Sequence, residues 1–239
     1  MQFKAYTDKG YIRERNEDNH LLKLDPYPVV VVADGMGGHR AGKIASKIAV
    51  ESIDNYDFNF DYTENILDEI KEAVILANNQ IIEKGRKNPS QQGMGTTISL
   101  AIVYNKKLFI GHVGDSRIYL YRNKQLERIT TDDSLVNELI KKGKISPEDA
   151  FDHPQKHILT QALGLDEHIN IEVDEISLKQ GDILLFCTDG LTDMLREEEI
   201  SKIVNSYNSD IEILAKKLGD KALENGGNDN VTLITGIIN

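Results

Sequence analysis

The chain has 239 residues, 40% hydrophobic and 28% charged, which is typical of a soluble globular protein with a sizeable core. Its formal net charge of -11 argues against a nucleic-acid or anionic-membrane surface, because both need clustered lysine and arginine. A single cysteine, Cys187, excludes an internal disulfide, and neither a signal-peptide core nor an apolar run of membrane-spanning length is present, so we expect a cytoplasmic protein without membrane insertion.

Apolar periodicity and turn residues predict alternating strands and helices. In chain order these are a strand at 29–33, helices at 41–53 and 63–84, strands at 96–104, 107–113 and 116–122, helices at 135–142 and 147–151, strands at 169–176 and 182–188, helices at 197–207 and 211–223, and a strand at 231–238. Gly85 is the predicted stop of the second helix. Asn105-Lys106 predicts a tight hairpin turn, and Ser146-Pro147 predicts a capped helix start.

The order of these elements favours an α+β layered fold with antiparallel sheets over a doubly wound parallel sheet. No linker or repeat divides the chain, so we expect one domain over residues 1–239. Residues 131–164 form a long polar stretch within a strand-rich region. Such insertions act as substrate-contacting lids about as often as they are surface excursions without a role.

Four aspartates stand at predicted strand ends. Asp34, Asp115 and Asp189 each follow an apolar strand, and Asp229 precedes one. Antiparallel neighbours place the end of one strand beside the start of the next, so all four carboxylates could meet at one edge. Each aspartate alone is more often a turn residue. Together they indicate a site for a hard cation such as magnesium or manganese, which prefers oxygen ligands.

The glycine-rich stretch after Asp34 resembles a phosphate cradle between a strand and a helix. Residues 37–43 spell GxxxxGK, but Ile44 stands where a nucleotide-binding P-loop needs serine or threonine. A P-loop protein, in which nucleotide binding depends on Lys43, is therefore the weaker alternative. A cysteine-dependent phosphatase is excluded, because Asp193 occupies the position where that mechanism needs arginine after Cys187.

Seven short motifs, in order, resemble those of the type 2C metal-dependent protein phosphatases, especially the short bacterial single-domain members. They are DxGxxRxxNED at 8–18, DGMGGHxxG at 34–42, GMGTT at 93–97, GDSR at 114–117, the flap residues at 153–154 and 163–164, TDGLTD at 188–193 and GGxDNxT at 226–232. The resemblance implies two antiparallel sheets packed as a sandwich between helix layers, with a flap at about 131–164. It also implies hydrolysis of phosphoserine and phosphothreonine on proteins by a metal-activated water.

The resemblance further assigns roles to individual residues. It implies two Mn²⁺ or Mg²⁺ ions, with a possible third. Asp34 would bridge the first two ions, the Gly35 carbonyl would bind one of them, and Asp189 and Asp229 would bind the other. Asp115 and Asp189 would form the third site, and Glu17 and Asp18 would act through metal-bound water. Arg13 would bind the substrate phosphate. Met36 replaces the histidine that eukaryotic members place after Asp-Gly, so His39 is the candidate proton donor, although a structural role is equally compatible.

The resemblance also implies partners. These are phosphorylated proteins, with a bacterial serine/threonine kinase and its targets as a plausible set, and we expect a monomer. A catalytically silent phosphoprotein-binding module on the same fold is the alternative, although the joint presence of Arg13, Asp34, Asp189 and Asp229 argues against it. The flap carries Asp132-Asp133-Ser134 where relatives often have Asp-His-Ser, so no role is carried over from that histidine.

Overall fold

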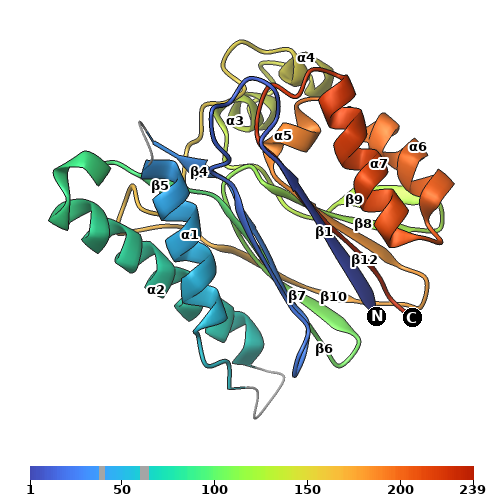
Figure 1. The fold of residues 1–239 in the computed structure, drawn as a ribbon, viewed down its shortest axis with the longest axis horizontal. Coiled ribbons are helices and arrows are strands. Elements are labelled where there is room, and N and C mark those ends of the chain that lie inside the picture. The colour runs from blue at the N-terminus through green and yellow to red at the C-terminus, as the bar shows by residue number, and fades with distance from the viewer. Residues whose placement is uncertain (38–40, 60–64) are drawn as a thin grey trace.

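A computed structural model describes residues 1–37, 41–59 and 65–239, and these form four layers (Figure 1). Two five-stranded antiparallel sheets pack face to face. Helices α1 (Ala41–Asp54) and α2 (Ile66–Lys87) cover one outer face, and α6 (Glu197–Tyr207) and α7 (Ile211–Glu224) cover the other. The predicted α+β sandwich between helix layers is confirmed.

The first sheet joins both ends of the chain. Its order is β1 (Gln2–Asp8), β12 (Val231–Ile237), β11 (Ile183–Cys187), β8 (Arg117–Arg122) and β9 (Gln125–Arg128). The second sheet has the order β10 (Glu172–Ser177), β7 (Lys107–Val113), β6 (Ile98–Tyr104), β3 (Val29–Ala33) and β2 (Asn19–Lys23). A two-stranded ribbon, β4 (Gly35–Met36) with β5 (Gly95–Thr96), continues from β3. Because β1 pairs with β12, the two termini lie side by side (Figure 1).

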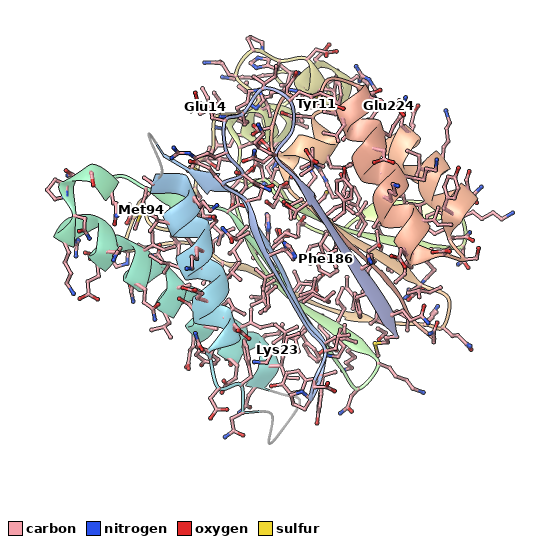
Figure 2. The ribbon with its side chains drawn as sticks, in the orientation of Figure 1. Tyr11, Glu14, Lys23, Met94, Phe186 and Glu224 are labelled. Carbon is pink, nitrogen blue, oxygen red and sulfur yellow. The ribbon has the colours of Figure 1, made fainter. Side chains whose placement is uncertain are left out.

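Three apolar layers hold the sandwich together. Strand β3 is buried on both faces: Val30 and Val32 point between the sheets, whereas Val29 and Val31 pack in the layer beneath α1 and α2. This alternation follows from the two-residue period of a strand. Phe186 of β11 is fully buried between the two sheets (Figure 2). The third layer fills the space between the first sheet and helices α6 and α7.

Most predicted elements appear within a residue or two of their predicted bounds, and the hairpin turn is confirmed by positive φ at Asn105 and Lys106. Gly85 was wrong as a helix stop, because α2 continues to Lys87. The helix ends there because Asn88 precedes Pro89, and proline disfavours helical backbone at the residue before it. The predicted helix start at 63 lies outside the described residues.

Two predicted strands are also shorter than expected. The strand predicted at 96–104 is interrupted at Thr97, whose N–H donates to the carbonyl of Asp34 instead of a ladder partner. The strand predicted at 169–176 begins only at Glu172, because the N–H of Asn170 donates to the Gln161 side chain. Strands β1, β2, β4 and β9 had no prediction.

Residues 131–164 leave the sandwich beyond β9 and return before β10. They carry the short helices α3 (Leu135–Lys141) and α4 (Pro147–Phe151). Two other short elements lie outside this segment: the 3₁₀ turn η2 (Pro89–Gln91) follows α2, and helix α5 (Asp189–Thr192) follows β11. Ser146 caps α4 as predicted, accepting the N–H of Asp149 at 3.1 Å. We call residues 131–164 the flap; Ser134 and Leu159 form a β-bridge across its base. Among the described residues, no helix is both long and apolar enough to cross a membrane.

Candidate active site

A cleft of about 1120 Å³ opens at the end of the sandwich where the strand-end loops of both sheets meet. Asp34 follows β3, Asp115 lies just beyond β7, Asp189 begins the short α5 after β11, and Asp229 precedes β12. All four aspartates line this cleft. The structure therefore brings together carboxylates that are up to 195 residues apart in sequence (Asp34 and Asp229).

The carboxylates are costly to ionise together. Burial raises the pKa of Asp34 and Asp115 well above the usual aspartate range, and the Asp189 carboxylate raises both further. The pKa of Asp189 rises from 3.8 to about 6, mainly through burial and then through the charges of Asp193 and Asp229. Without a cation bound among these aspartates, like-charge repulsion therefore opposes ionisation of the whole cluster.

Asp18 adds a fifth carboxylate beneath the cleft. Its Oδ2 accepts the hydroxyl of Thr188 at 2.9 Å, and burial, with the charge of Asp189, raises its pKa well above the usual range. Oδ1 of Asp18 and Oδ1 of Asp189 are both buried and accept no hydrogen bond from any residue within the described ranges. Buried anionic oxygens without donors are costly, and an all-oxygen set of this kind suits Mg²⁺ or Mn²⁺.

Threonines hold the backbone of Asp34 in place. Its N–H donates to the hydroxyl of Thr97 at 2.9 Å, and its carbonyl accepts the N–H of Thr97 at 2.9 Å and the hydroxyl of Thr96 at 2.8 Å. These contacts explain the two threonines of the GMGTT motif, because they hold the backbone of Asp34 and so orient its side chain at the end of β3.

Glycines allow the cleft backbones to approach closely. A Cβ built on Gly35 would lie 2.2 Å from the carbonyl oxygen of Gly42 in α1, and a Cβ on Gly190 would lie 1.9 Å from the carbonyl oxygen of Asn230. Side chains at either position would push these segments apart. This close packing keeps Gly35 beside Asp34 among the residues that line the cleft.

The N-terminal segment reaches the cleft over β12. Arg13 donates to Asp229 at 2.6 Å and its side chain is 57% exposed, so its guanidinium lies at the cleft mouth. Asn230 ties the segment down: its carbonyl oxygen accepts the N–H of Glu17, and its NH₂ donates to the carbonyls of Lys9 and Arg15, each at 2.8 Å. Asn230 is 5% exposed, which makes this a buried clamp.

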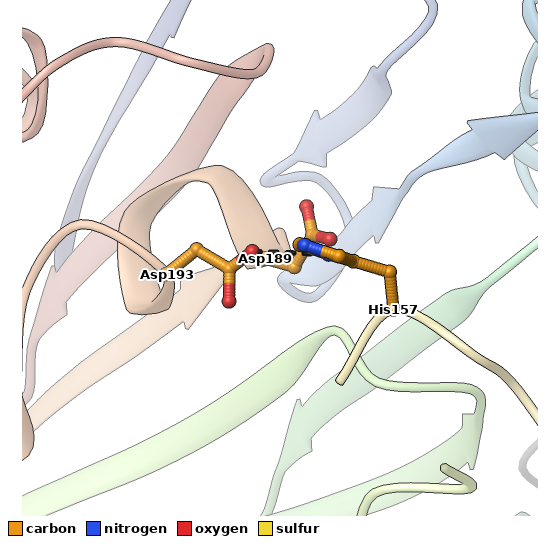
Figure 3. Close-up of side chains that lie close together, drawn as sticks. All are labelled: His157, Asp189 and Asp193. Carbon is orange, nitrogen blue, oxygen red and sulfur yellow. Dashed lines mark ion pairs between the residues drawn. The ribbon is translucent and has the colours of Figure 1, made fainter. Parts of the chain in front are cut away.

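The flap contributes a histidine that the sequence did not single out. His157 Nδ1 lies 3.2 Å from Asp193 Oδ2, and Lys156 Nζ lies 3.1 Å from Asp193 Oδ1. His157, Asp189 and Asp193 bring ligand-type atoms within 4.8 Å of one another (Figure 3). These contacts tie residues 156 and 157 of the flap to Asp193, the last residue of the TDGLTD motif.

The other candidates from the sequence lie as follows. Glu17 lines the cleft, and burial raises its pKa. His39 lies outside the described residues. Lys43 is exposed and is not among the residues that line the cleft.

Cys187 is fully buried and burial raises its pKa to about 12, which fits a core residue and not a nucleophile. Asn230, Thr188 and His157 were not predicted as site residues; the first two lay within recognised motifs, but their partners are distant in sequence.

Comparison with known proteins identifies the family. A model of the protein phosphatase 2C family matches residues 13–225. "Serine/threonine phosphatase stp" of Listeria welshimeri is 40% identical over 239 residues, covering 98% of this chain and 94% of the relative. The crystal structure of the Mycobacterium tuberculosis serine/threonine phosphatase PstP/Ppp superposes with a TM-score of 0.92 at 32% identity, covering 99% of this chain and 98% of the other.

A second PstP structure, of the catalytic domain in complex with two manganese ions, superposes with a TM-score of 0.89 at 30% identity and covers 100% of this chain and 98% of the other. The extent of these matches agrees with the four-layer fold and with the order of the seven motifs. The chain belongs to the protein phosphatase 2C family.

Proposed function

We propose that this protein is a phosphatase that removes phosphate from phosphoserine and phosphothreonine in proteins, using Mn²⁺ or Mg²⁺. The observation that carries the proposal is the cluster of Asp34, Asp115, Asp189 and Asp229 in one cleft with Arg13 at its mouth. The names of the relatives, and the two manganese ions of the PstP complex, support it.

The residues of the cleft fit two cations. We assign Asp34 to both ions, the Gly35 carbonyl to one of them, and Asp189 and Asp229 to the other. The buried, donor-free oxygen of Asp189 supports this assignment. When bound, two such ions provide a nucleophilic water at neutral pH and offset the charge of the phosphoryl group.

Further acidic residues complete the assignment. Asp115 and Asp189 are assigned to a third ion, and Glu17 and Asp18 act through water. The buried oxygen of Asp18 that lacks a donor favours such a role. Thr188 keeps the other oxygen of Asp18 occupied, so that the carboxylate presents a single defined oxygen.

Arg13 is assigned to the substrate. Its guanidinium can donate two parallel hydrogen bonds to phosphate oxygens, which orients the ester and offsets charge that grows during the displacement. The clamp made by Asn230 holds the segment that carries Arg13, so the guanidinium approaches from a fixed direction. His39 stays the proposed proton donor to the leaving oxygen. An unchanged pH–rate profile in His39→Ala would exclude this role.

The partners follow from the same chemistry. We propose that the substrates are phosphorylated proteins in the cytoplasm, including a bacterial serine/threonine kinase and its targets, and that the protein acts as a monomer. The single, fully buried cysteine is compatible with a reducing compartment. Residues 131–164 are proposed to act as a flap subdomain of a single domain spanning residues 1–239.

The test compares variants under metal control. The protein is stripped with EDTA, and phosphate release from a phosphothreonine peptide is measured with and without Mn²⁺ for wild type, Asp229→Asn and Lys43→Met. We expect Mn²⁺ to restore activity to wild type and to Lys43→Met, and Asp229→Asn to lose at least a hundredfold. Calorimetric titration with Mn²⁺ alone should show weaker binding in Asp229→Asn, which tests the metal assignment independently of activity.

Two outcomes would count against the proposal. A folded wild type that releases no phosphate when Mn²⁺ is added would favour the silent binding module. Nucleotide binding that is lost in Lys43→Met, without phosphatase activity, would favour the P-loop alternative.

A further inference from the structure

The cleft is chemically uneven along its rim. The N-terminal segment supplies the charged side chains Arg13, Glu14 and Arg15. Of the described residues that line the cleft, the large apolar ones are Met36, Leu159 and Leu165, which we call the apolar patch. A phosphate-binding floor accounts for the charged side chains, but it leaves the apolar patch without a role.

The apolar patch is held in place by backbone contacts. Met36 pairs with Gly95 in the β4–β5 ribbon, and an ideal Cβ on Gly95 would lie 3.2 Å from Cδ2 of Leu165. Met36 and Leu165 are therefore neighbours across a position that has no side chain. Leu163, two residues before Leu165, exchanges both backbone hydrogen bonds with Thr96, at 3.0 and 2.9 Å.

The third member is fixed from the flap base. Leu159 forms a β-bridge with Ser134, and the N–H of Leu135 donates to the neighbouring carbonyl of Ile158 at 2.8 Å. Leu165 is nevertheless 53% exposed. A leucine that is both fixed and half exposed at a cleft mouth presents apolar surface that no described part of the chain covers.

The apolar patch lines the same cleft as the aspartates, and this position indicates which ligand would cover it. Any polypeptide whose phosphate reaches the carboxylate floor must lay the residues beside its phosphorylated position on the rim. We infer that Leu165, with Met36 and Leu159, forms a specificity subsite for an apolar side chain of the substrate one or two residues from the phosphorylated serine or threonine. The inference rests on the proposed function and narrows its substrate class.

The test uses two phosphothreonine peptides that differ only in the two residues on each side of phosphothreonine, which are leucine in one and asparagine in the other. The two side chains are similar in size, so the ratio of kcat/KM for the two peptides reports apolar contact. Wild type, Leu165→Asn and Leu165→Met are compared with Mn²⁺ present. Leu24→Asn, at a residue 46% exposed and outside the cleft lining, is the matched control.

We expect wild type to prefer the leucine peptide about tenfold, equivalent to about 1.4 kcal/mol. Leu165→Asn should abolish most of this preference, whereas Leu165→Met and Leu24→Asn should keep it. Equal rates on both peptides in wild type, or a preference that survives in Leu165→Asn, would overturn the inference while leaving the proposed function intact. Failure of wild type to cleave either peptide would instead overturn the proposed function and the inference with it.

Discussion

Removing one carboxylate from the cleft should stabilise the protein when metal is absent. In Asp189→Asn the side chain keeps its size but loses its charge. The pKa of Asp189 is raised from 3.8 to about 6 by burial and by the charges of Asp193 and Asp229, so the folded protein resists ionisation of this group. The unfolded chain does not, and ionisation at neutral pH therefore favours unfolding.

The sign and size of this destabilisation follow from the two pKa values of Asp189, 3.8 in the unfolded chain and about 6 in the folded protein. Below pH 3.8 the carboxyl is protonated in both states and costs nothing. Between pH 3.8 and about 6 the cost of ionisation grows, and above that range it is fully present. At about 1.4 kcal/mol for each unit of pKa shift, the free-energy cost of ionising Asp189 in the folded protein is at most about 3 kcal/mol at pH 7.

The assay is urea unfolding in EDTA at pH 7 and pH 4. We expect Asp189→Asn to exceed wild type in free energy of unfolding by about 1–3 kcal/mol at pH 7, with most of the difference gone at pH 4. Asp174→Asn, at an exposed position of β10, is the control and should match wild type at both values. Adding Mn²⁺ should stabilise wild type more than Asp189→Asn. An Asp189→Asn variant no more stable than wild type at pH 7 in EDTA would refute the electrostatic reasoning.

Two further perturbations test what holds the cleft. Arg117→Met should lower the free energy of unfolding in urea by about 3–5 kcal/mol, because Nη2 of Arg117 donates to Asp132 at 2.7 Å and Asp132 is only 7% exposed. The control Lys142→Met, which removes an exposed ion pair with Glu138, should leave the urea midpoint unchanged. Thr188→Val should cost about 2 kcal/mol by removing the hydroxyl that donates to Asp18, and a loss under about 0.5 kcal/mol would show that this hydrogen bond is not needed for stability.

The strand-end aspartates could be placed from sequence because their signal is local. Asp34 and Asp189 each stand just beyond a run of buried apolar residues, and such a run predicts a buried strand that ends near the aspartate. The Asn105-Lys106 hairpin is local in the same sense, since its positive φ values depend on two adjacent residues. Antiparallel pairing explains only the neighbours within one sheet, such as the end of β11 beside the start of β12. Asp34 and Asp189 lie at strand ends of different sheets, so the face-to-face packing of the two sheets, which no local pattern predicts, brings them into one cleft.

Other features depend on contacts that no local pattern reports. Strand β1 carries mostly part-buried or exposed residues and exists because β12, more than 220 residues later, pairs with it from Gln2 opposite Ile237 onwards. Gly85 sits inside a helix because Pro89, and not the glycine, sets the end of α2. His157 reaches Asp193 only through the path of the flap, so its spacing in sequence carries no sign of the contact.

The pairing of β1 with β12 also explains why the cleft needs both ends of the chain. Asp8, the last residue of β1, pairs with Val231, and a Cβ built on the next glycine, Gly10, would lie 2.2 Å from the carbonyl oxygen of Asp229. This close approach carries the chain directly to Arg13, which bonds to Asp229. The segment assigned to phosphate and the aspartate assigned to metal are thus fixed by the same backbone contact. A side chain at Gly10 would displace both, so a loss of metal affinity and a loss of substrate affinity should arise together from that one position.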